Sequence, residues 1–239
     1  TPGQLLVLRR LTAATSNRAL IAWDCSHSAG VVRHRFRDDV VDLAFGCGYK
    51  YLNGGLGAAA WLYFHPRLRD RLPGLAGWFG SDPARQFEMS TEFFPAADCD
   101  RFLMGTPNVF SLAPLLGSLH VLNEAGIDRI RAKSVAQTTF LTEYAEARLS
   151  RYGVGVVTPR DSSRRGGHVT LSHPEAAKLS RALRAAGVVP DFRPPDMLRL
   201  APAPLYTSFA ECAAAVDTLE SILATNSHHQ LADSDELVT

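Results

Sequence analysis

Three short apolar runs alternate with loops in the first part of the chain. Residues 19–23 are continuously apolar and end at Asp24, and largely apolar runs follow over residues 40–45 and 57–64. Runs of this length are typical of strands that are buried on both faces of a parallel sheet. The segment between the second and third runs, residues 46–55, contains too many glycines for a regular element and is predicted to be a loop.

Helical periodicity begins near Ser111. Gly126 separates a first helix from a longer one, and Gly153 ends the longer helix. The pattern then changes to two strand-like segments, residues 154–158 and 168–172, which are joined by a basic turn. A helix between Pro174 and Gly187 follows, and a last helix opens with the capping-box spacing of Ser208 and Glu211.

These elements predict an α/β chain with two domains and a tail. Residues 1–150 are expected to form part of a large α/β domain, and residues 154–225 a small α+β domain. Residues 226–239 are polar and acidic without periodicity, and are expected to be a loose tail.

Composition and charge exclude several classes of function. Hydrophobic residues make up 46% of the chain and charged residues 21%, the balance of an ordinary globular protein. The 25 Lys and Arg against 24 Asp and Glu give a net charge of +1, so no charge surplus points to a nucleic acid or an anionic membrane. Because the chain has neither an apolar run that could span a bilayer nor a basic-then-apolar leader, a cytoplasmic protein with a small-molecule partner is expected.

Asp24 and Lys50 are the candidate chemical groups. Each follows a predicted strand, and ligands of open α/β sheets bind at the carboxyl ends of the strands. A carboxylate and a lysine there suggest pyridoxal 5'-phosphate, because the lysine binds this cofactor covalently and the carboxylate keeps its pyridine nitrogen protonated. The glycines of residues 46–55 would let the backbone approach the planar ring. From the pattern alone, it is equally consistent that Asp24 caps a strand end and that Lys50 is a solvated loop lysine.

A series of short strings extends over nearly all of residues 19–224. The strings are Trp23-Asp24-x-x-His27-Ser28-x-Gly30, Gly46-Cys47-Gly48-Tyr49-Lys50-Tyr51-Leu52-Asn53-Gly54-Gly55, Gly77-Trp78-Phe79-Gly80, Gly105-Thr106-Pro107, Arg165-Gly166-Gly167-His168-Val169 and Asp191-Phe192-Arg193-x-Pro195-Asp196-x-Leu198-Arg199. In this order they resemble the kynureninases, a family of fold-type I pyridoxal-phosphate enzymes. The resemblance implies part of an aspartate-aminotransferase-like large domain followed by a small α+β domain. It also implies hydrolysis of kynurenine or 3-hydroxykynurenine to an anthranilate and alanine.

The resemblance further implies roles around the cofactor. Lys50 would bind the cofactor and move protons at the substrate α-carbon, and Asp24 would pair with the pyridine nitrogen. His27 would lie beside the cofactor, and Tyr49 would contact its phosphate and assist proton transfer.

Three more residues take family roles by resemblance. Trp78 and Thr106 fall at cofactor-binding positions, and Arg199 would bind the substrate α-carboxylate through its planar guanidinium. Gly105-Thr106 resembles the bacterial members, which favours kynurenine as the substrate. The structural alternatives are that His27 caps a turn, that Trp78 is a surface aromatic and that Thr106 is a turn residue.

Other polar groups receive no chemical role. Arg160 and Arg164 are interpreted as a solvated basic turn, and Arg165 is not predicted to have a structural role. The four cysteines lack CxxC spacing, so neither a disulfide framework nor a zinc site is indicated. Five histidines show no ligand spacing, and no metal is predicted. These histidines are His34, His65, His120, His168 and His173.

The resemblance leaves out an N-terminal portion of the family. That portion supplies a ring-stacking aromatic residue, part of the phosphate cradle and another acidic residue. A homodimer is expected by resemblance, and negligible turnover is expected from the chain alone. The alternatives are a truncated homologue that is inactive alone and another fold-type I lyase or desulfurase, although Cys25 and Cys47 are expected in the core rather than on a mobile loop.

Overall fold

The computed structural model describes residues 3–6, 8–15 and 19–230 of the protein. The chain divides into an N-terminal unit, Val7–Glu124, and a C-terminal unit, Ala125–Thr239 together with Thr1–Leu6. The division falls before the longest helix, whereas the boundary predicted from the sequence comes after it, between residues 150 and 154.

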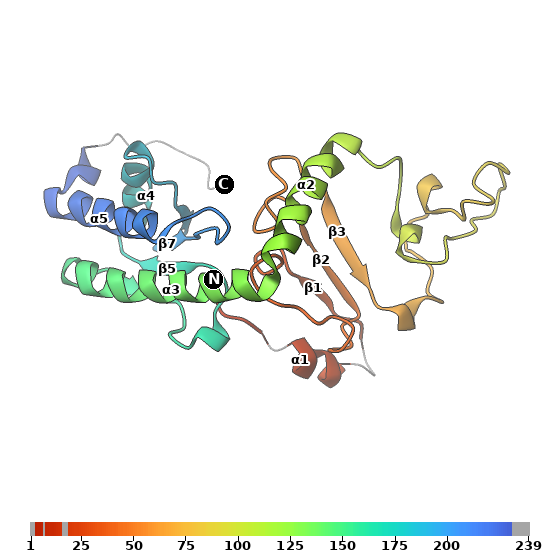
Figure 1. Ribbon diagram of the computed structural model, residues 1–239, viewed down its shortest axis with the longest axis horizontal. Coiled ribbons are helices and arrows are strands. Elements are labelled where there is room, and N and C mark those ends of the chain that lie inside the picture. Colours follow the sequence, from red (N-terminus) through yellow and green to blue (C-terminus); the bar gives the residue numbers. More distant parts are fainter. Residues whose placement is uncertain (1–2, 7, 16–18, 231–239) are drawn as a thin grey trace. The chain divides into compact units, whose positions relative to one another are not determined.

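A three-stranded sheet in the order β1-β2-β3 forms the centre of the N-terminal unit (Figure 1). β1 (Ala22–Asp24) is parallel to β2 (Leu43–Cys47), and β3 (Ala60–Phe64) is antiparallel to β2. All three predicted strands are confirmed, but the parallel arrangement holds only for the first two. α1 (Leu8–Thr15) precedes the sheet.

β1 is more exposed than the sequence predicts. Ala22 and Asp24 are exposed and Trp23 is half-buried. The prediction that this strand is buried on both faces is therefore wrong. In the sheet formed by the described residues, β1 is an edge strand that pairs only with β2.

Three 3-10 helices and one long helix follow β3. Arg101 is buried within this segment. Its Nε donates to the Ala96 carbonyl at 3.0 Å, and this hydrogen bond stabilises the irregular backbone. The elements are η1 (Pro66–Leu68), η2 (Trp78–Gly80), η3 (Cys99–Phe102) and α2 (Val109–Ala125).

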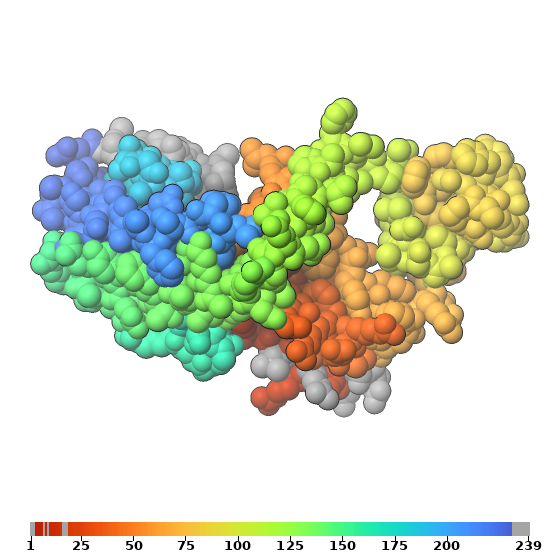
Figure 2. Space-filling view, in the orientation of Figure 1, coloured from red at the N-terminus to blue at the C-terminus, as the bar shows by residue number. Residues whose placement is uncertain are grey.

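α2 exposes several large apolar side chains, of which Phe110 is 91% exposed. Figure 2 draws atoms of this yellow-green helix at the surface of the face that it shows. No helix in the described part of the chain, α2 included, is long and apolar enough to cross a membrane. The exposed residues are Val109, Phe110, Leu112, Leu116 and Val121.

The C-terminal unit combines a four-stranded antiparallel sheet, in the order β4-β5-β7-β6, with three helices. One apolar core joins the helices to β5 and β7, and its centre includes Leu141, Leu171, Leu179 and Leu219. Strands β6 and β7 have no counterpart among the predicted strands. The elements are α3 (Ile127–Leu149), η4 (Ser150–Tyr152), β4 (Gly155–Val156), η5 (Ser162–Arg164), β5 (Val169–Ser172), α4 (Ala176–Ala185), β6 (Asp191–Arg193), β7 (Met197–Leu200), α5 (Phe209–Thr225) and η6 (Ser227–His229).

Arg165 is a structural residue of this unit, and the sequence interpretation of it is wrong. Its side chain is only 2% exposed. Nε donates to Thr138 Oγ1 at 3.1 Å, and the terminal nitrogens donate to Thr139 Oγ1 and to the Arg160 carbonyl. The guanidinium therefore bonds the basic turn to α3, while Arg160 and Arg164 are exposed as predicted.

The segment after α5 is folded at its start. Asn226 ends α5 in the left-handed conformation, and residues 227–229 form η6. His228 is buried at 2% exposure, so the predicted loose tail does not begin at residue 226. Residues 231–239 of that predicted tail lie outside the described residues.

Candidate functional site

The carboxyl ends of β1 and β2 lie side by side because these strands are parallel. Asp24, the last residue of β1, pairs with Phe45, and the amide of Cys25 donates to the Phe45 carbonyl at 2.8 Å. At the next residue, Ser26 Oγ accepts a hydrogen bond of 3.3 Å from the amide of Cys47, the last residue of β2. The loops after both strands, which carry predicted site residues, are therefore bonded to each other.

Asp24 presents an ionised carboxylate at this edge of the sheet. Its Oδ1 accepts a hydrogen bond from the Ser26 amide at 2.8 Å. The hydrogen bonds from Ser26 lower the pKa of Asp24, and the charges of His27 and Lys50 lower it further against the opposing effect of partial burial. Asp24, His27 and Lys50 thus share one electrostatic environment. Sequence reasoning missed Ser26, although a serine two residues after an aspartate is a common turn signal.

The loop after β2 holds Lys50 by backbone hydrogen bonds. The Gly54 amide donates to the Gly48 carbonyl at 2.9 Å and closes the loop, and the Asn53 amide donates to the Lys50 carbonyl at 2.9 Å. Lys50 Nζ lies 5.5 Å from the centroid of the Tyr49 ring, within cation–π range. Within the described residues this amine has no hydrogen bond or ion pair.

Two glycines at this edge are required by the protein's own backbone. A Cβ at Gly48 would lie 2.5 Å from the Ala59 carbonyl oxygen. At Gly30, φ is +88° and a Cβ would lie 2.5 Å from the Tyr51 carbonyl oxygen. These contacts explain both glycines by close packing of the loops. The approach of a planar ring to the glycines of residues 46–55 stays a prediction.

Trp78 and Thr106 lie elsewhere in the N-terminal unit. Trp78 opens η2, and its Nε1 donates to the Gln86 carbonyl at 3.3 Å. Thr106 is exposed in the loop before α2. Within the described residues, neither side chain makes a hydrogen bond, ion pair or ring contact with Asp24 or Lys50. The structure therefore brings together four predicted site residues, Asp24, His27, Tyr49 and Lys50, without linking these two to them.

Arg199 belongs to the C-terminal unit, and its guanidinium already has a carboxylate partner. It is 8% exposed in β7, and two of its nitrogens donate to Oδ2 of Asp191, its cross-strand neighbour in β6. Arg193 donates to the same oxygen at 3.2 Å. Asp191 therefore already accepts hydrogen bonds from two of the three guanidinium nitrogens. Sequence reasoning gave Asp191 no role, although it lies eight residues before Arg199 within one string.

Solved structures place this arrangement in a known class of fold. A cysteine desulfurase from Thermococcus onnurineus superimposes with a TM-score of 0.75 at 18% identity, covering 93% of this chain and 57% of its own. A cysteine desulfurase from Escherichia coli gives 0.71 at 20% identity over 94% of this chain and 55% of its own, and an alanine–glyoxylate aminotransferase from Nostoc gives 0.68 at 18% over 92% and 58%. The protein has the α/β fold of the C-terminal part of fold-type I pyridoxal-phosphate enzymes.

Sequence comparison identifies the family within that class. Residues 130–219 match the family described as "Kynureninase C-terminal domain". The chain is 43% identical to the kynureninase of Geobacillus thermodenitrificans and 42% identical to that of Bacillus anthracis, in each case over 99% of this chain and 55% of the relative. The protein is therefore a kynureninase homologue, and it spans about 55% of the length of these relatives.

Proposed function

We propose that this chain provides the cofactor-binding lysine and the C-terminal part of a kynureninase that hydrolyses L-kynurenine to anthranilate and L-alanine. The observation that carries the proposal is the junction of the β1 and β2 loops, where Asp24, His27, Tyr49 and Lys50 come together. The identity of 43% to a curated kynureninase supports the reaction. The alternative substrate is 3-hydroxykynurenine. A comparison of kcat/KM for kynurenine and 3-hydroxykynurenine would show which of the two the assembled enzyme prefers.

The side chains at this junction fit pyridoxal 5'-phosphate by their chemistry. When bound, this cofactor supplies an electron sink beside the substrate α-carbon. Asp24, kept ionised by Ser26, would hold a proton on the pyridine nitrogen. Lys50 would provide the primary amine that binds the cofactor, and would then carry a proton at Nζ. The exposed phenol of Tyr49 would donate a hydrogen bond to an anionic oxygen, and His27 would lie beside the ring.

Trp78, Thr106 and Arg199 complete the proposed site by family resemblance. Trp78 and Thr106 would contact the cofactor, and Arg199 would bind the substrate α-carboxylate. A bidentate guanidinium–carboxylate contact is strong and directional, and an ammonium group cannot reproduce it. Because Asp191 competes for the same nitrogens, Arg199→Lys should raise the KM for kynurenine more than it lowers kcat. An unchanged KM would remove Arg199 from the proposed site.

We also propose a homodimer and a requirement for the rest of the family's chain. The exposed large apolar side chains of α2 support burial of part of this helix in the assembled enzyme. Light scattering on the assembled enzyme should give the mass of two complete subunits. The chain alone should release negligible anthranilate, and a chain that carries the rest of the family's length should restore activity.

The decisive experiment is covalent labelling of Lys50. The protein contains only three lysines, Lys50, Lys133 and Lys178, so borohydride reduction with pyridoxal phosphate followed by peptide mass mapping resolves the site. The label should fall on Lys50 and be lost in Lys50→Ala, while the control Lys133→Ala keeps it. A label on either of the other lysines, with Lys50 unmodified, would refute the assignment.

A desulfurase function is the second candidate, because two of the structural neighbours are cysteine desulfurases. Their identity of 18–20% reflects the fold alone. Cys25 is buried in the sheet core, and burial raises the pKa of its thiol, which opposes formation of a reactive thiolate. Sulfide release from cysteine, measured beside anthranilate release from kynurenine, separates the two reactions.

A further inference from the structure

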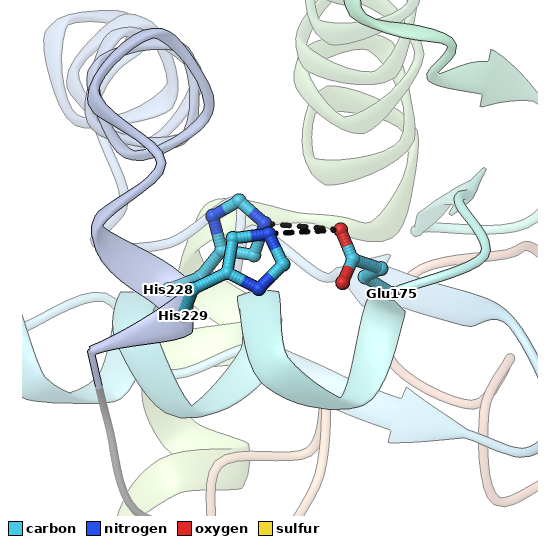
Figure 3. A group of neighbouring side chains, drawn as sticks. All are labelled: Glu175, His228 and His229. Atoms are coloured by element: carbon cyan, nitrogen blue, oxygen red, sulfur yellow. Dashed lines mark hydrogen bonds and ion pairs between the residues drawn. The ribbon is translucent and has the colours of Figure 1, made fainter.

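A carboxylate and two imidazoles converge in the C-terminal unit, on residues without a role in the proposed reaction. Glu175 lies at the start of α4, and His228 and His229 are adjacent in η6, after α5. Figure 3 shows both rings turned towards one carboxylate oxygen. His228 Nε2 lies 3.2 Å and His229 Nε2 3.4 Å from Glu175 Oε2, although 53 residues separate Glu175 from His228.

The spacing of these atoms matches a metal coordination shell. One ligand atom from each residue lies within 4.8 Å of the other two. Zinc bonds to nitrogen and oxygen of about 2.1 Å in a tetrahedral arrangement place neighbouring ligand atoms about 3.4 Å apart. The two nitrogen–oxygen distances of 3.2 and 3.4 Å are close to this value, and the two imidazole nitrogens lie within 4.8 Å of each other.

We propose that Glu175, His228 and His229 bind a divalent transition-metal ion of the zinc class. Two imidazoles and one carboxylate favour such an ion over magnesium or calcium, which prefer oxygen ligands. Three protein ligands leave a fourth position for water. The bound ion would link the segment after α5 to the start of α4. This structural role does not depend on kynurenine cleavage.

The surroundings of the three ligands are consistent with this role. Lys178 Nζ donates to Glu175 Oε1 at 3.1 Å, which leaves Oε2 directed at the imidazoles. The Glu175 carboxylate accepts a hydrogen bond from His228 Nε2, so the ring proton lies on Nε2 when no metal is bound. His228 Nδ1 is buried and has no hydrogen-bond partner among the described residues, and metal binding at Nε2 would move the ring proton to this nitrogen. His229 Nδ1 lies 3.5 Å from Lys178 Nζ. If Nδ1 carries the ring proton, this contact is lost, and the half-exposed ring can then donate to water.

A competing cluster provides the internal control. Asp98, Cys99 and Asp100 are also close enough to share an ion, but all three are exposed and consecutive in the sequence. Asp98 Oδ1 already accepts the Asp100 amide at 3.0 Å as a helix cap. A thiolate ligand in this cluster would give a bound cobalt ion a sulfur-to-metal charge-transfer band, which a histidine and carboxylate site lacks.

The test is calorimetric titration of the chelator-treated protein with Zn²⁺ alone, and absorption spectroscopy with Co²⁺. The unaltered protein should bind one equivalent of Zn²⁺ and give cobalt bands without a sulfur charge-transfer band. Outer-shell substitutions weaken metal binding about 10- to 100-fold, so loss of a direct ligand in His229→Ala or Glu175→Gln should weaken it by about 100-fold. The control variants His120→Ala, an exposed imidazole in α2, and Cys99→Ser should bind Zn²⁺ as the unaltered protein does.

Several results would overturn the proposal. They are no saturable Zn²⁺ binding, a sulfur charge-transfer band that disappears in Cys99→Ser, and equal affinity in His229→Ala and the unaltered protein. His229 is half-exposed, so its replacement leaves the core intact, and the cobalt spectrum of the unaltered protein does not depend on any variant. Neither measurement requires turnover, so failure here leaves the proposed kynureninase function unaffected.

Discussion

Gly30 controls the position of the Lys50 loop, and Gly30→Ala tests this dependence. With φ at +88°, Gly30 adopts a conformation that L-residues avoid. An added Cβ would lie 2.5 Å from the carbonyl oxygen and 2.7 Å from the carbonyl carbon of Tyr51, both backbone atoms next to Lys50. The clash cannot be relieved by rotating a side chain, so the loop itself has to move.

The expected cost follows from two separate terms. The left-handed conformation costs an alanine about 1–2 kcal/mol, and overpacking costs about 1–3 kcal/mol. Gly30→Ala should therefore destabilise the N-terminal unit by about 2–5 kcal/mol. Gly55→Ala is the matched control, because Gly55 has φ of +77° but nothing within 4 Å of its added Cβ. Gly55→Ala should therefore lose only the free energy of placing alanine in the left-handed conformation. Both substitutions reduce the conformational entropy of the unfolded chain in the same way, so that effect cancels in the comparison.

Urea unfolding followed by tryptophan fluorescence measures this difference. All three tryptophans, Trp23, Trp61 and Trp78, lie in the N-terminal unit and report on it selectively. Displacement of a reacting group by about 1 Å can cost about 100-fold in rate, so borohydride labelling of Lys50 should also slow in Gly30→Ala and not in Gly55→Ala. Equal destabilisation in the two variants would refute the reasoning from the Tyr51 contact.

Further outcomes concern the C-terminal unit and Asp24. Arg165→Met should destabilise the C-terminal unit by about 4 kcal/mol or more, because it removes three charged hydrogen bonds that contribute about 1.5–3 kcal/mol each. The exposed Arg160→Met should cost below about 1 kcal/mol. Urea unfolding followed by circular dichroism compares the two variants, and equal values would contradict the buried role of Arg165. Ser208→Ala should cost about 1 kcal/mol through loss of the α5 cap, by the same assay. Asp24→Asn should retain some cofactor and lose most turnover in the assembled enzyme. The lowered pKa of Asp24 contributes stability that is present above its ordinary value near 3.8 and is lost as the pH falls through the lower folded value. The stability difference between Asp24→Asn and the unaltered protein should therefore shrink below about pH 4, and a constant difference would contradict this linkage.

Local chemistry made several features predictable from the sequence. The capping box of Ser208 and Glu211 opens α5 as predicted, because it needs only residues three positions apart. Gly153 ends the helical segment with φ of +79° for the same local reason. Asp24 and Lys50 were identified by their positions after strands, and the parallel pairing of β1 and β2 brings their loops together.

Only the tertiary structure decided which polar groups are buried and which distant residues meet. Arg165 is indistinguishable from Arg164 in a basic turn until α3 supplies Thr138 and Thr139 as acceptors. His228 reads as part of a polar tail until its segment packs on Glu175. Sequence periodicity describes how one segment divides its own faces, whereas burial and ion pairing depend on the segments that pack against it. Those contacts join residues tens of positions apart, so no local pattern along the chain encodes them.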